Sequence, residues 1–81
     1  MLRFTYMDKT ETAKTDIVGL LSEIYGQKVG SFFLSTHGKE PIPVFVHNSY
    51  ILLKQNMGAY KATEELDRIL SKQGVSISSY D

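Results

Sequence analysis

Residues 30–55 of the chain, GSFFLSTHGKEPIPVFVHNSYILLKQ, decide the fold that the sequence predicts. This stretch is rich in valine, isoleucine, phenylalanine and tyrosine, which β-strands favour. Residues 37–40 suit a four-residue hairpin loop, and Asn48-Ser49 suits a two-residue turn. We therefore predict a meander of three antiparallel strands over residues 29–55. Pro41 and Pro43 cannot donate ladder hydrogen bonds, so they fit the middle strand less well.

The predicted sheet has two apolar faces, because side chains alternate between faces along a strand. The mostly aliphatic face is expected to be core and holds Phe33, Ile42, Val44, Val46, Ile51 and Leu53. The more aromatic face holds Phe32, Leu34, Pro43, Phe45, His47, Tyr50 and Leu52. A shift of register by one residue would exchange the two faces.

A helix is predicted on either side of the meander. Over residues 8–25, Asp8 and Glu11 have the spacing of a capping box, and apolar residues follow at helical spacing as far as Gly26. Residues 59–73 repeat the helical pattern after a break at Gly58 and end at Gly74, a residue type that commonly ends helices.

Short strands are predicted at both ends of the chain, over residues 2–7 and 75–78. The resulting order is β-α-β-β-β-α-β, in a single α+β domain that spans residues 1–81. A ferredoxin-like βαββαβ sandwich is the alternative if residues 50–55 form a loop. The expected core contains Leu20, Ile24, Phe33, Val44, Val46, Leu66 and Ile69.

Composition limits the classes of partner. Nine basic and nine acidic residues cancel, whereas proteins that bind phosphate backbones need clustered lysine and arginine. The absence of cysteine excludes disulfides, thiolate metal sites and cysteine nucleophiles. The longest apolar run is far shorter than the ~20 residues that span a bilayer, and the first residues lack the apolar region of a signal peptide. We expect a cytoplasmic protein with no membrane partner.

The polar residues form no recognisable catalytic or metal motif. His37 and His47 are the two histidines, and neither belongs to a convergent set of metal ligands in the sequence. The serines lie in no Gly-x-Ser-x-Gly context. Glu64, Glu65 and Asp67 fit a solvated face near a helix N-terminus, where negative charge is favourable. We therefore predict no enzyme activity, no catalytic residue, no metal and no cofactor.

Three short patches carry a resemblance: Gly30-Ser31, Ile42-Pro43-Val44 and residues 68–75, RILSKQGV. They resemble motifs of the HicA toxin family, small RNA-cleaving proteins with an α-β-β-β-α fold like that of double-stranded-RNA-binding domains. The resemblance implies that fold over about residues 16–77. Phe32 and Phe33 stand where the family places histidines, and phenylalanine cannot do acid or base chemistry on a 2′-hydroxyl. The resemblance thus favours the fold and argues against RNA cleavage.

The aromatic face provides the functional prediction. A domain of 81 residues has little mass left to cover a second apolar face. We expect that face to bind a partner, and the alternative is that the N-terminal strand covers it with Phe4 and Tyr6. The predicted function is a small non-catalytic protein-binding module of the inhibitor, antitoxin or regulatory type, whose partner is another protein or a second copy of the chain. The alternative is an RNA-binding domain. The predicted partner-binding residues are Phe32, Phe45, His47, Tyr50 and Leu52.

Overall fold

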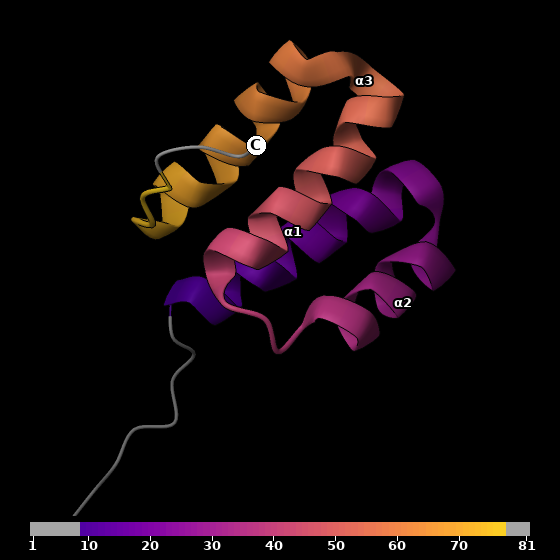
Figure 1. Ribbon diagram of the computed structural model, residues 1–81, viewed down its shortest axis with the longest axis horizontal. Helices are drawn as coiled ribbons and strands as arrows, with labels where there is room; N and C mark the ends of the chain where they lie inside the picture. Colours follow the sequence, from indigo (N-terminus) through magenta and orange to yellow (C-terminus); the bar gives the residue numbers. More distant parts are fainter. Residues whose placement is uncertain (1–8, 78–81) are drawn as a thin grey trace, which may run out of the picture.

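Three helices make up most of residues 9–77, the part of the chain that the computed structural model describes. Helix α1 spans Lys9–Tyr25, α2 spans Gln27–His37 and α3 spans Ile42–Gln73 (Figure 1). No strand lies within residues 9–77, so the predicted α+β fold is wrong, both as a three-stranded meander and as a ferredoxin-like sandwich. The strand predicted over residues 2–7 falls outside the described residues, and residues 75–77 are not a strand.

The stretch that was expected to be a meander forms α2 and the first part of α3. Its buried residues recur at intervals of one helical turn rather than at alternate positions: Gly30 and Phe33 on α2, then Phe45, Val46, Ser49, Tyr50 and Leu53 on α3. This spacing places them on one face of each helix. The predicted hairpin loop at residues 37–40 corresponds to the connection between α2 and α3, whereas the predicted turn at Asn48-Ser49 lies inside α3.

The two prolines mark the start of α3. Pro41 is its N-cap residue, and Pro43 lies in the first turn. A proline is tolerated there because the first N–H groups of a helix have no partner within the helix. The feature that fitted a middle strand poorly is therefore a regular helix start.

Glycines with positive φ divide the helices at the positions that the sequence predicts. Gly26 (φ 103°) ends α1 after Tyr25, and Gly74 (φ 72°) ends α3 after Gln73. Gly58 adopts φ 86° and ψ 163° inside α3 and separates residues 42–57 from residues 59–73. We call these the first and second halves of α3. Both predicted helices are confirmed, although Asp8 lies outside the described residues.

Helix α1 is the central element of the fold. Both α2 and α3 pack mainly on α1, and the second half of α3 folds back beside the first half (Figure 1). The buried core residues are Ala13, Ile17, Leu21, Phe33, Phe45, Val46, Tyr50, Leu53, Ala62, Leu66, Ile69 and Leu70. Phe33, Val46, Leu66 and Ile69 are buried as predicted, whereas Leu20 and Ile24 are half-buried and Val44 is 43% exposed.

Polar contacts fasten the other helices to α1. The buried Lys14 Nζ donates hydrogen bonds to the carbonyl oxygens of Gly38 (2.9 Å) and Glu40 (2.6 Å), in the connection between α2 and α3. Gln73 Nε2 at the end of α3 donates to Asp16 Oδ2 on α1 at 3.0 Å. These contacts fix both ends of α3 relative to α1. No helix within residues 9–77 combines the length and apolar character needed to cross a membrane.

Candidate partner-binding surface

The helical fold distributes the five predicted partner-binding residues differently from a sheet. Phe32 on α2 is 71% exposed, whereas Phe45 on α3 has no exposed surface and belongs to the core. Tyr50 is 6% exposed, and His47 and Leu52 are half-buried. The expected pairing of Phe32 with Phe45 on one apolar face is therefore absent. Phe45 instead contacts Phe33, with the ring centroids 5.1 Å apart in an edge-to-face arrangement.

Phe32 and Leu52 lie together in a groove between α2 and the first half of α3. The groove has a volume of about 260 Å³. It exists because both helices pack mainly on α1 rather than on each other. Its lining is mostly apolar and consists of Val29, Phe32, Phe33, His37, Asn48 and Leu52. We call it the α2–α3 groove.

The polar end of this groove is held by a small hydrogen-bonded cluster. His37 Nδ1 lies 2.9 Å from Glu40 Oε1, and Asn48 Nδ2 donates to the same carboxylate oxygen at 3.1 Å. The His37 ring also contacts the Phe33 ring, with centroids 4.6 Å apart. The predicted loop position of His37 and turn position of Asn48 are wrong, because His37 lies on α2 and Asn48 on α3. The cluster therefore gives the groove a rigid end.

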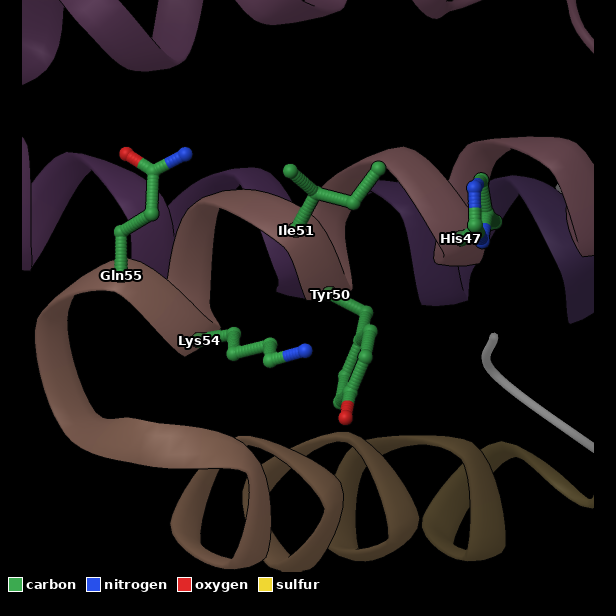
Figure 2. Close-up of a pocket in the computed structure, with 5 residues that line it drawn as sticks. All are labelled: His47, Tyr50, Ile51, Lys54 and Gln55. Carbon is green, nitrogen blue, oxygen red and sulfur yellow. The ribbon is translucent and has the colours of Figure 1, made fainter.

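His47 and Tyr50 line a second groove, which runs along the first half of α3. This groove has a volume of about 520 Å³ and is lined by His47, Tyr50, Ile51, Lys54 and Gln55. Tyr50 and Lys54 point toward the second half of α3, whereas Ile51 and Gln55 lie on the opposite side of the helix (Figure 2). The Lys54 ammonium is 5.7 Å from the centroid of the Tyr50 ring. We call it the hinge groove, because the kink at Gly58 folds the second half back beside it.

A ridge of exposed apolar side chains separates the two grooves. Val44 and Ile51 on the first half of α3 are 43% and 42% exposed, and Val29 on α2 is 36% exposed. The predicted position of Val44 and Ile51 on the core face of a sheet is wrong, since both side chains are exposed. If residues 42–55 are treated as a helix, Val44 and Ile51 share one face, because they are seven residues apart, and the buried residues lie on another face. We call Val29, Phe32, Val44, Ile51 and Leu52 together the α2–α3 surface.

Charge is unevenly distributed over the helices. Residues 26–60 carry three lysines, Lys28, Lys39 and Lys54, and one acidic residue, Glu40, which already binds Asn48 and His37. The acidic residues of α1 and of the second half of α3 are Glu11, Asp16, Glu23, Glu64, Glu65 and Asp67. Hydrogen bonding to Glu65 at 2.6 Å raises the pKa of Arg68.

A third cavity, of about 280 Å³, lies between α1 and the second half of α3. Its lining carries both signs of charge, from Asp16, Glu23, Arg68 and Lys72. Within residues 9–77, no three histidine, aspartate or glutamate side chains converge to hold a metal ion. The α2–α3 groove and the hinge groove are both mostly apolar, whereas this third cavity is mostly polar.

Comparison of the chain with protein-family models, with curated proteins and with solved structures finds no match. These comparisons do not bear on the resemblance to HicA toxins. The α-β-β-β-α fold that this resemblance implies is, however, not the all-helical fold of residues 9–77. The function must therefore be argued from the α2–α3 surface itself.

Proposed function

We propose that this protein is a small non-catalytic module that binds a partner protein through the α2–α3 surface. The observation that carries the proposal is the position of Phe32, which leaves 71% of its surface in water beside an apolar groove. Full burial of a phenylalanine side chain is worth about 1.5–3 kcal/mol, so this exposure leaves stabilisation available to a complex. Exposed apolar side chains beside a groove are typical of an interaction site.

The surface resembles a protein interface more closely than an RNA-binding one. Single-stranded nucleic acids are held by several stacked rings in a basic groove. Within residues 27–57, Phe32 is the one phenylalanine or tyrosine ring that is exposed. Protein interfaces, in contrast, combine an aromatic anchor with aliphatic neighbours and an adjoining groove. A partner protein is therefore the better fit, and the module would act by occupying that partner, as an inhibitor, antitoxin or regulatory subunit does.

The experiment compares Phe32→Ser with Tyr60→Ser as baits for proteins from the native host. Tyr60 is a matched control because it is also an exposed aromatic residue (81%), but lies on the second half of α3. We expect the parent and Tyr60→Ser to retain the same partner protein. The amount retained by Phe32→Ser should be about 30-fold lower, since interface anchors typically contribute at least about 2 kcal/mol. Quantitative mass spectrometry of the retained proteins measures the difference.

Two controls make the bait experiment decisive. Circular dichroism of each variant should show an unchanged helical content, because neither side chain is buried. Sedimentation of the purified parent and of Phe32→Ser shows whether the partner is a second copy of the chain. Equal retention of every protein by all three baits, with no self-association of the parent, would contradict the proposal. Retention of RNA that weakens steeply with salt would point to phosphate contacts instead.

A further inference from the structure

The shape of the α2–α3 surface fits a helix better than a small molecule. Val44 and Ile51 are separated by seven residues along one helix, which corresponds to about 10.5 Å at 1.5 Å per residue. A partner helix offers apolar side chains at the same interval, because its positions i and i+7 also lie on one face. The α2–α3 groove, at about 260 Å³, is smaller than the ~300–1,000 Å³ of typical ligand pockets, so it suits individual side chains.

The hinge groove does not enclose a ligand either. Its five lining residues all come from residues 47–55 of the first half of α3, so it is walled mainly by one helix. Ile51 belongs to the ridge and also lines the hinge groove, so the hinge groove adjoins the ridge there. The α2–α3 groove adjoins the same helix at Leu52. A helix lying along the ridge can therefore place side chains on both sides of it.

The charge of α2 and of the first half of α3 indicates which charge the partner helix carries. Residues 26–60 have a formal charge of +2, from three lysines and one glutamate, and Lys28, Lys39 and Lys54 are all exposed. The remaining described residues carry five basic and six acidic residues, a formal charge of −1. An acidic partner is thus attracted to α2 and the first half of α3 and is disfavoured elsewhere, because complementary potentials steer association and set its orientation.

Among the three lysines of residues 26–60, Lys54 lies beside an aromatic ring. Its ammonium lies over the ring of Tyr50, and Tyr50 is fixed because 94% of its surface is buried. A cation held over an aromatic face loses little further freedom when a carboxylate approaches. Ile51 and Lys54 both line the hinge groove, so a partner segment that enters it meets an apolar side chain and an ammonium group.

From these observations we infer that the segment which binds the α2–α3 surface is an acidic amphipathic helix of the partner protein, an inference that rests on the proposed function. Its apolar face lies on Val44, Ile51 and the α2–α3 groove, against Phe32. Its carboxylates lie toward Lys54, which lines the hinge groove, and toward Lys28, the exposed residue before Val29 on α2.

The test uses two designed peptides of about five helical turns, both stapled so that they are helical before binding. Both carry leucine at i, i+3, i+4 and i+7, and their polar positions are glutamate in one and lysine in the other. Fluorescence anisotropy with the full chain should show that the glutamate peptide binds at least about tenfold more tightly than the lysine peptide. Phe32→Ser should weaken the glutamate peptide at least about tenfold, and Tyr60→Ser should leave it unchanged.

Charge reversal separates the role of charge from that of apolar contact. Lys28→Glu with Lys54→Glu should weaken the glutamate peptide at least about tenfold. The control, Lys61→Glu with Lys72→Glu, makes the same change in net charge on the second half of α3. It should lower the affinity for the glutamate peptide less than about threefold, because exposed charges farther away are screened by salt.

The outcomes distinguish this inference from the proposed function. If both peptides bind equally and Phe32→Ser weakens both, the surface binds helices but the acidic character is wrong. If neither peptide binds, the helical occupant is wrong, whatever the bait experiment gives. If vesicles containing phosphatidylserine bind through Phe32 and Lys54 while the glutamate peptide does not, the occupant is a membrane surface and the inference is overturned.

Discussion

Two glycines of the helical region have opposite structural roles. A Cβ atom on Gly30 of α2 would lie 2.0 Å from Ser22 Oγ and 3.2 Å from the carbonyl oxygen of Val18, both on α1. Gly30 therefore permits the close approach of α2 to α1. Gly19 of α1 is exposed, and a Cβ atom there would meet nothing within 4 Å. Its presence only weakens the helix, because glycine costs up to about 1 kcal/mol relative to alanine in a helix interior.

Alanine at these two positions should consequently change stability in opposite directions. We expect Gly30→Ala to lower the free energy of unfolding by about 1–3 kcal/mol, as overpacking does. Gly19→Ala should raise it by about 0.5–1 kcal/mol through helix propensity and a less flexible unfolded chain. Urea denaturation followed by circular dichroism measures both. A Gly30→Ala variant as stable as Gly19→Ala would show that α1 and α2 are not packed this closely.

The residues of the candidate surface were only partly predictable from the sequence. Phe32 and Leu52 were identified, because apolar side chains in excess of what a small core can hold must lie at the surface. The prediction that Phe45 binds a partner fails, because exposure depends on which face of an element each side chain occupies and Phe45 is buried. The sequence does not point to Lys54, because its position depends on the neighbouring Tyr50 ring and on a kink four residues later.

At the level of elements, the helices bounded by glycine were predictable and the stretch between them was not. Local signals identified α1 and the second half of α3, because residues that stop a helix act through their own backbone conformation. Residues 29–55 contain many β-branched and aromatic residues, and strand propensity of that kind is readily overridden by tertiary packing. Ser49 also obscured the helical period, being a buried polar residue whose hydroxyl donates to the carbonyl oxygen of Phe45 at 2.8 Å.

Gly58 provides a test of the kink in α3. Its φ of 86° and ψ of 163° lie in a region that is essentially restricted to glycine, and forcing another residue there costs about 1–3 kcal/mol. Gly58→Ala should lose stability by this amount. It should also form dimers at high concentration, since straightening α3 releases the second half to pack on another copy.

Light scattering coupled to size-exclusion chromatography measures the dimer, and urea denaturation measures the loss of stability. Asn56→Ala is the matched control, because Asn56 is exposed and lies in the helix two residues before the kink. Asn56→Ala should form no more dimer than the parent at the same concentration. An unchanged stability and an unchanged oligomeric state of Gly58→Ala would contradict the kinked structure.

At the scale of the whole molecule, stability depends on contacts made with α1. Ile17 and Leu21 on α1 have no exposed surface, and neither does Leu66 on the second half of α3. The contacts that fix the second half also include the hydrogen bond between Gln73 and Asp16. The core therefore draws on helices that lie more than forty residues apart in the sequence.

Truncation of Leu66 tests this arrangement against the sheet that the sequence predicted. Leu66→Ala should reduce the free energy of unfolding by about 2–5 kcal/mol, the range for buried leucine. Val44→Ala is the discriminating control, because Val44 is 43% exposed in the helical fold but would be core in the meander. It should change stability by less than about 0.5 kcal/mol. A large loss for Val44→Ala in chemical denaturation would argue against the exposed position of this side chain.

The central position of α1 has a consequence for synthesis of the chain. Ribosomes make α1 before the two helices that pack on it, and an isolated helix of 17 residues is only marginally stable in water. Its apolar face has no complete cover until residues 59–73, which contribute Leu66 and Ile69, have been translated. The nascent chain thus exposes this face to chaperones and proteases throughout translation of α2 and of the first half of α3, and the core is complete only when the second half of α3 has been made.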